Sequence, residues 1–123
     1  MDTKKLIMNT LKNNVQLIGH LGKDPELKTF DTGKTKLSAT MATNKYYKNK
    51  DGDTVNDTTW HNIVAWGKTA EQMDKLLSKG NELAVKGKLA SRSYDDKEGN
   101  KRYITEVVVN EFVKITKKEE LPF

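Results

Sequence analysis

The sequence of 123 residues predicts an all-β domain, built as a five-stranded barrel with one α-helix between strands three and four. Two observations predict this fold class. Short runs rich in β-branched and aromatic residues alternate with clusters of turn-forming residues from Val15 onward, and only one stretch places its apolar residues at helical spacing. The length allows one ordinary domain, which we expect at 14–116, between an N-terminal extension at 1–13 and a short tail at 117–123.

Three of the predicted strands precede the helix, and they span 15–21, 36–47 and 58–66. Each strand is bounded by residues that favour turns. Asp24-Pro25 follows the first strand and a Thr-Gly pair precedes the second. A polar loop at 48–56 connects the second strand to the third.

The helix is predicted at 69–79, because four apolar residues form one stripe there: Ala70, Met73, Leu76 and Leu77. Thr69 opens a capping box and Gly80 stands in the position of a helix stop. Two further strands follow at 82–95 and 102–116, joined by a polar hairpin connection. The order β-β-β-α-β-β is the arrangement of the OB-fold, a partly open five-stranded barrel.

Residues two apart on a strand share a face, and this period places Trp60 and Trp66 together on the third strand. Such a pair either belongs to the core or forms an exposed aromatic surface. On the fourth strand the same period separates an inner row from an outer row. The inner row is Leu83, Val85, Gly87 and Leu89, and the outer row contains Lys86, Lys88, Arg92 and Tyr94. A solvated strand face also carries lysine, but Tyr94 has little core to join beside a loop.

Another aromatic and cationic cluster lies where the second strand ends, at Tyr46, Tyr47, Lys48 and Lys50. Single-stranded nucleic acid needs this mixture, because its bases stack on aromatic rings while Lys and Arg neutralise the phosphates. Duplex DNA hides the faces of its bases, so stacking selects single strands without a code for base identity. The pattern therefore predicts a surface that binds single-stranded nucleic acid.

Composition argues against several other classes of protein. The absence of cysteine excludes disulfides and Cys-ligated metals, and two histidines cannot build a multi-histidine site, so we expect no metal and no cofactor. No serine lies in the context of a nucleophile elbow near either histidine, and we expect no enzyme activity. No apolar run reaches the length of a membrane-spanning helix, and none resembles a signal peptide, so we expect a cytoplasmic protein without a membrane partner. The net charge of +5 alone favours an anionic partner only weakly.

Three segments match a known family: VQLIGHLGKDPE at 15–26, TTWHNIVAWGK at 58–68 and KRYITEVVV at 101–109. With these motifs in order, the chain resembles bacterial single-stranded-DNA-binding proteins over about 14–113. The resemblance implies an OB-fold homotetramer, with a dimer as the alternative. It also implies a non-enzymatic protein that coats single-stranded DNA during replication, recombination and repair in the nucleoid.

The resemblance also implies roles for single residues. Base stacking falls to Tyr47, Trp60, Trp66 and Tyr94. Phosphate contacts fall to Lys28, Lys48, Lys50, Lys68, Lys79, Arg92 and Arg102, to which the outer row of the fourth strand adds Lys86 and Lys88. His61 matches a position at the subunit interface of the family, and a core histidine is the alternative. Four positions where relatives often carry a cation do not match, so we expect weaker electrostatics: Asn14, Val55, Ser78 and Ser93.

The tail departs most from the family, whose members continue into a long Gly- and Pro-rich linker that ends in acids and an apolar-Pro-Phe tip. Here a similar tip follows the barrel without that linker, and it consists of Glu119, Glu120, Leu121, Pro122 and Phe123. The resemblance implies that this tip docks replication and repair proteins. A frayed C-terminus is the alternative.

Two other functions remain open at this point. A cold-shock-like or primosomal OB module would bind RNA or a replication protein, and such an RNA module would prefer one sequence motif. An interaction protein would depend on its oligomer and its tip, with residual DNA binding. Competition between nucleic acids separates the first alternative, and deletion of 119–123 separates the second.

Overall fold

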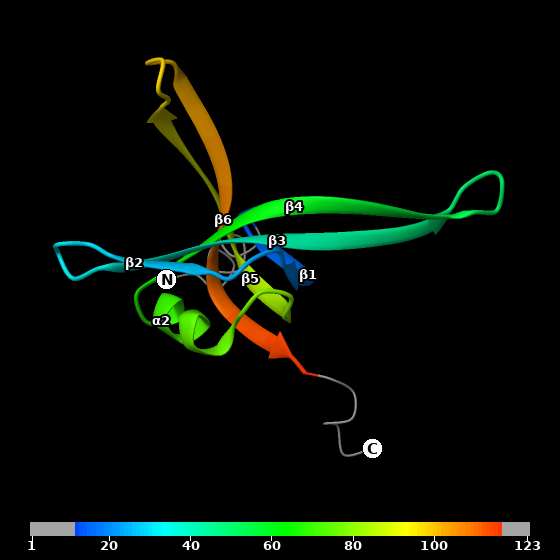
Figure 1. Cartoon of the computed structure of the whole chain (residues 1–123), viewed down its shortest axis with the longest axis horizontal. Coiled ribbons are helices and arrows are strands. Elements are labelled where there is room, and N and C mark those ends of the chain that lie inside the picture. Colours follow the sequence, from blue (N-terminus) through cyan, green and yellow to red (C-terminus); the bar gives the residue numbers. More distant parts are fainter. Residues whose placement is uncertain (1–11, 117–123) are drawn as a thin grey trace, which may run out of the picture.

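The computed structural model describes residues 12–116, and five of its strands form a barrel (Figure 1). In chain order the elements are β1 (Val15–Leu21), β2 (Glu26–Thr29), β3 (Thr35–Lys48), β4 (Thr54–Trp66), α2 (Gly67–Leu76), β5 (Glu82–Asp95) and β6 (Lys101–Ile115). The strand order is β1-β5-β6-β4-β3-β2, and a further pairing of β1 with β3 closes the ring. The predicted all-β fold class and the helix between the third and fourth barrel strands are confirmed.

The barrel closes where β1 crosses β3, through the pairs His20–Ala42 and Leu21–Met41. Gly19 lies just before this crossing, where a Cβ atom would overlap the carbonyl group of Ala42. Only glycine therefore lets the two backbones approach closely enough to pair. The largest fully buried side chains form one core, to which the strands contribute Leu37, Met41, Ile63 and Leu83 and the helix α2 contributes Met73.

Three hairpins project from this ring in different directions: β2–β3, β3–β4 and β5–β6 (Figure 1). Two of their turns use the same chemistry. The side chain of Asn49 accepts hydrogen bonds from the N–H groups of Asp51 and Asp53, both 3.0 Å long. The side chain of Asp96 accepts from Glu98 and Asn100, both 2.9 Å long. These local bonds replace ladder bonds at each tip.

One strand was missed, and the start of another is wrong. β2 was not expected, because all four of its residues are exposed and an edge strand of this kind shows no alternation of apolar and polar residues. β4 begins at Thr54 rather than Thr58, so the predicted loop at 48–56 shrinks to the turn at 49–53. β3 pairs with β4 out to Lys48 and Thr54, which leaves a short turn between them.

The predicted capping box is also wrong. The helix begins at Gly67, and Trp66 occupies the cap position in extended conformation without a side-chain hydrogen bond. Thr69 lies inside the first turn, where it cannot cap. The helix ends at Leu76, and Gly80 takes its positive φ of 86° in a later turn, where its N–H donates to Leu21.

The predicted inner row of β5 holds only in part. Leu83, Val85 and Gly87 are buried, whereas Leu89 is half exposed. β6 carries an irregularity opposite Lys86 and Gly87, and beyond it the β5–β6 hairpin leaves the barrel (Figure 1). Leu89 lies directly opposite the buried Val107 and itself remains half exposed.

Candidate nucleic-acid interface

The outer face of the barrel carries both tryptophans. Directly opposite residues of an antiparallel pair share a face, and β3–β4 pairs Ala42 with Trp60 and Lys36 with Trp66. The side chains of Trp60 and Trp66 are 60% and 44% exposed. The core alternative for this pair is therefore wrong, and two indole rings lie open to solvent on one face.

Trp66 is flanked by an aromatic ring and a cation. Its ring is nearly parallel to that of Phe30, with 6.3 Å between centroids and 23° between planes. The Nζ atom of Lys36 lies 5.4 Å from the centroid of Trp66, and that of Lys28 lies 5.1 Å from the centroid of Phe30. Lys28, Lys36 and Trp66 form one row across β2, β3 and β4. Stacking surface and positive charge therefore lie side by side here.

Trp60 lies against the chain just after β1. A Cβ atom on Gly22 would lie 2.5 Å from the Trp60 ring and 3.2 Å from the Thr40 hydroxyl. Along β4 between the two tryptophans the same face bears Asn62 and Val64, which line a small hollow of about 180 Å³. Two bases stacked on the tryptophans would have this polar hollow between them.

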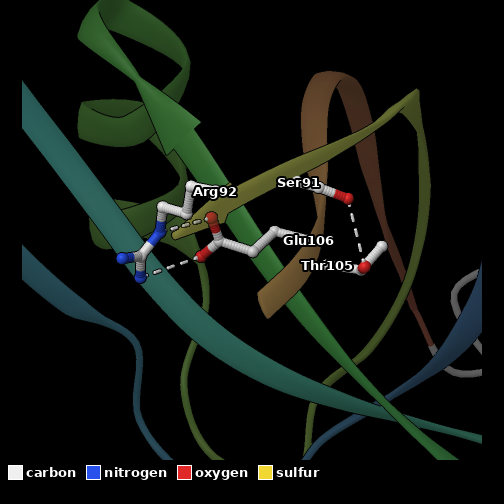
Figure 2. Close-up of polar contacts among 4 residues, drawn as sticks. All are labelled: Ser91, Arg92, Thr105 and Glu106. Carbon is white, nitrogen blue, oxygen red and sulfur yellow. Dashed lines mark hydrogen bonds and ion pairs between the residues drawn. The ribbon is translucent and has the colours of Figure 1, made fainter. Parts of the chain in front are cut away.

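Arg92 of β5 lines the same hollow. Glu106 of β6 holds its guanidinium (Figure 2). Its Nε donates to Oε1 of Glu106 at 2.9 Å, and its Nη2 donates to Oε2 at 3.5 Å. Glu106 is the buried charged side chain of the described chain, with 7% of its surface exposed. Ser91 and Thr105 are one residue earlier on each strand, and their hydroxyls bond at 3.3 Å on the opposite face of the hairpin (Figure 2).

Tyr94 lies further out on the β5–β6 hairpin, on the face that carries Arg92, and is directly opposite Arg102. Arg102 donates from Nε to Oδ2 of Asp96 at 2.9 Å. This guanidinium, followed by the backbone N–H groups of the turn, lowers the pKa of the Asp96 carboxyl below its ordinary value of 3.8. The ring and the cation are thus presented together near the tip of the hairpin.

Tyr47 lies on the other side of the β3–β4 ribbon from Trp60. The register pairs Tyr47 with Val55 and Tyr46 with Asn56. Because residues two apart share a face, Tyr46 continues the face of Ala42 and Trp60, whereas Tyr47 continues that of His61. Both tyrosines are exposed. The predicted stacking residues are therefore distributed over both sides of this hairpin.

The predicted phosphate contacts fall into several places. Lys68 lines, with Lys34 and Trp66, an open hollow of about 520 Å³ at the start of α2. Lys88 shares a row with Val64 and Val108 of the barrel face. The others are more distributed. Lys48 and Lys50 lie at the tip of the β3–β4 hairpin, and Lys79 lies in the turn after α2. The structure thus places Lys28, Lys68, Lys88 and Arg92 near the two tryptophans or in the rows between them.

Lys86 lies on a different part of the outer surface. It is directly opposite Gln16 of β1 and Glu111 of β6. These residues line a largely apolar hollow of about 550 Å³ together with Ile18 and Val113, which are 62% and 64% exposed. If Lys86 contacts a phosphate, the DNA therefore lies beside an apolar surface.

His61 occupies the opposite face of β4 from the tryptophans, directly across from Met41. Its Nε2 lies 3.0 Å from the Thr43 hydroxyl. The ring is partly buried and has a hydrogen-bond partner within its own chain. This geometry is compatible with both roles considered for His61, at an interface and as a core histidine.

The predicted tip, 119–123, lies outside the described residues, as do residues 1–11 of the N-terminal extension. Asn13 of that extension binds both backbone groups of Leu89, at 2.8 and 2.9 Å. Between residues 12 and 116 there is no group of three acidic or histidine side chains that could hold a metal ion. No helix of that same part is long and apolar enough to cross a membrane.

Sequence reasoning missed three residues of this face: Phe30, Lys36 and Glu106. Phe30 and Lys36 reach Trp66 only because β2 folds back on β3, and β2 had no sequence pattern to predict it. Tyr46 was seen as part of a cluster, but its face follows from the register of β3 with β4. Glu106 could have been found, because the β5–β6 connection sets a register that pairs Arg92 with Ile104 and so places Glu106 two residues along the same face.

Comparison with known proteins gives consistent matches. The model of the "Single-strand binding protein family" matches residues 12–115. A protein named single-stranded DNA-binding protein 1 from Chlorobaculum tepidum is 44% identical over 97 residues, which cover 78% of this chain and 60% of that protein. Its namesake from Xylella fastidiosa is 40% identical over 109 residues, 88% of this chain and 80% of that one. A solved Plasmodium falciparum SSB in complex with ssDNA superposes with a TM-score of 0.75 at 25% identity, covering 85% of this chain and 95% of that one.

Proposed function

Because this chain belongs to the single-strand binding protein family, we propose that it binds and coats single-stranded DNA without regard to base sequence. It does so as a binding protein rather than an enzyme, on strands exposed during replication, recombination and repair in the bacterial nucleoid. The relatives named single-stranded DNA-binding protein and the solved complex with ssDNA support this proposal.

One observation carries the proposal, and it is the exposure of Trp60 and Trp66 on the same face of the barrel. Removal of a large aromatic side chain from water lowers the free energy, so two exposed indoles on one face indicate a ligand. Bases are the ligand that flat rings beside cations accept, and each stacked base contributes about 1–3 kcal/mol. Every base has such a face, which makes the contact independent of sequence.

Charge around the rings supports a polyanion as the ligand. Lys28 and Lys36 are directly opposite each other on β2 and β3, and two like charges so placed repel. A phosphate between or beside them relieves that repulsion. Lys68 lines a hollow with Trp66, and Lys88 lies in the row next to that of Trp66, so both add positive charge near the rings. We propose the remaining cations, at the hairpin tips and after α2, as contacts for a strand that extends beyond the barrel face.

The experiment that tests the proposal is a competition assay. A fluorescein-labelled dT oligomer is bound to the protein, and unlabelled homopolymers, matched duplex DNA and RNA of the same length compete for it. We expect dT, dC and dA oligomers to compete to a similar degree and duplex DNA to compete poorly. A marked preference for one RNA motif would support an RNA module instead, and no binding at all would support the interaction protein.

We also propose that the chain assembles with copies of itself, as a homotetramer or through a dimer. The exposed side chains of Ile18 and Val113, on either side of Ala84, form an apolar patch that supports such an assembly. Before the closure, β1 pairs only with β5. Among the described residues, the other edge of this part of β1 therefore has backbone groups without a strand partner. Val113→Glu should lower the mass measured by sedimentation equilibrium. His61→Ala tests whether that side chain also contributes.

Docking of replication and repair proteins by the tip is the last part of the proposal. A terminal carboxylate, two glutamates and an apolar Leu-Pro-Phe sequence suit a partner pocket lined with cations. Deletion of 119–123 should abolish partner binding and leave the affinity for a dT oligomer unchanged. A parallel loss of DNA binding would contradict this separation.

A further inference from the structure

Glu106 places a buried negative charge in the floor of the proposed DNA surface, and this calls for an explanation. The hollow between Trp60 and Trp66 is lined by two cations, Lys23 and Arg92, and two anions, Glu26 and Glu106. Its charges cancel. A surface that only attracted phosphates would carry no carboxylate there, so Glu106 has to act on something other than the overall attraction.

The contact with Arg92 shows what it acts on. Glu106 takes the Nε–H of the guanidinium and more weakly one Nη2–H, while about half of the Arg92 side chain stays exposed. The third guanidinium nitrogen has no bond among the residues drawn (Figure 2). The guanidinium has five N–H donors, so Nη1 and the second hydrogen of Nη2 remain for a ligand. Arg92 is held by one side and open on the other.

We propose that Glu106 is a positioning residue for DNA binding, which stays bonded to Arg92 in the complex so that the pair, neutral overall, presents directed hydrogen-bond donors to the DNA. This rests on the proposed function. The alternative is that Arg92 leaves Glu106 for a phosphate. That would leave a carboxylate whose side chain is only 9% exposed without its partner, which costs more free energy than an exposed phosphate contact returns. Keeping the pair avoids this cost.

Salt dependence distinguishes the two cases, because a contact that neutralises a phosphate releases a counterion and a neutral pair does not. Log affinity for single strands falls with log salt by about 0.7 for each phosphate neutralised. Affinity for a labelled dT oligomer is measured from 50 mM to 1 M KCl for the intact chain, for Glu106→Gln and for the double variant Arg92→Gln/Glu106→Gln. Gln keeps the shape and one acceptor of Glu106, and the double variant has the same net charge as the original. Lys88→Gln removes a lysine that has no ion-pair partner in the described chain and calibrates the loss of a free cation.

The proposal predicts that Glu106→Gln unmasks Arg92. The slope steepens by about 0.7, and binding becomes about 8-fold tighter at 50 mM if the two proteins are equal at 1 M. The double variant binds more weakly but keeps the original slope. The proposal is overturned if Glu106→Gln leaves the slope unchanged and the double variant is as shallow as Lys88→Gln.

Nuclear magnetic resonance of the Arg92 Nε–H in the unmodified protein provides a second test, which does not depend on a variant that folds. The proposal predicts that this proton keeps its shifted, slowly exchanging signal when dT is added. Loss of that signal on binding means that the hydrogen bond between Arg92 and Glu106 has broken, and it refutes the proposal while the proposed function stands. An unmodified chain that does not bind dT refutes both.

Discussion

Removal of each tryptophan should have the same effect on DNA binding but a different effect on stability. Trp60→Ala and Trp66→Ala each delete one exposed ring, so each should weaken binding to dT, dC and dA oligomers by about 1–3 kcal/mol. This corresponds to about 5- to 150-fold in the dissociation constant. The loss should be nearly equal for the three homopolymers, because a ring that stacks does not select a base.

The difference in stability follows from the neighbours of each ring. Trp66 stacks on Phe30 and lies under Lys36, whereas the described residues place no ring or cation over Trp60. An aromatic pair contributes about 0.5–1.5 kcal/mol and an exposed cation–π contact about 0.5–1 kcal/mol. We therefore expect Trp66→Ala to lower the free energy of unfolding by about 1–2.5 kcal/mol more than Trp60→Ala.

Fluorescence anisotropy with labelled oligomers measures the affinity, and urea unfolding at one fixed protein concentration measures the stability. Trp60→Phe and Trp66→Phe serve as controls, because they keep a ring at each position and should recover most of the affinity. A folded Trp60→Ala variant that binds as tightly as the original would contradict the stacking role of Trp60. Two alanine variants that unfold at the same urea concentration would contradict the stabilising contacts of Trp66.

Three further predictions follow from the geometry. Tyr47→Ala should weaken the binding of long dT oligomers but not of one that spans only the barrel face, because Tyr47 lies on the far side of the β3–β4 ribbon. Fluorescence anisotropy measures this, and an equal loss of affinity at all oligomer lengths would contradict it. Gly22→Ala should displace the Trp60 ring, shift its fluorescence and weaken dT binding. Gly33→Ala is the control, because Gly33 lies in an exposed turn with positive φ; it should lower stability and leave the Trp60 emission unchanged. Arg102 and the turn N–H groups lower the pKa of Asp96, so the ionised Asp96 carboxylate stabilises the β5–β6 turn fully above pH 3.8. This stabilisation is lost as the pH falls through the lowered pKa. An NMR titration of the Asp96 carboxyl carbon with a midpoint at or above 3.8 would contradict this.

The alternation of side chains along the strands made most of the barrel predictable. Leu83 and Val85 point inward and Lys86 and Lys88 outward, as the period of two requires. β2 could not be predicted in this way, because none of its side chains is buried. The helix start was misplaced because Trp66, with no capping side chain, occupies the position that sequence rules reserve for polar residues.

The candidate site was predictable where it depends on one strand and not where it depends on two. Trp60 and Trp66 share a face by their spacing within β4 alone. By contrast, the contact of Lys36 with Trp66 needs the register between strands, and so does the side of the ribbon on which Tyr47 lies. Register depends on turn lengths and bulges, and the run of polar residues at 48–56 gave no sign that the turn was so short.

Tryptophan fluorescence in single-tryptophan variants shows directly whether single-stranded DNA lies on Trp60 and Trp66. Trp60→Phe leaves only Trp66 and Trp66→Phe leaves only Trp60, so each emission reports one ring. Both proteins are titrated with dT oligomers of increasing length, with matched duplex DNA and RNA as competitors. If DNA stacks on this face, both emissions are quenched, the effect grows with oligomer length, and duplex DNA fails to reverse it. If dT binds and neither emission changes, the strand does not lie on the tryptophans, and the assignment of this face is contradicted.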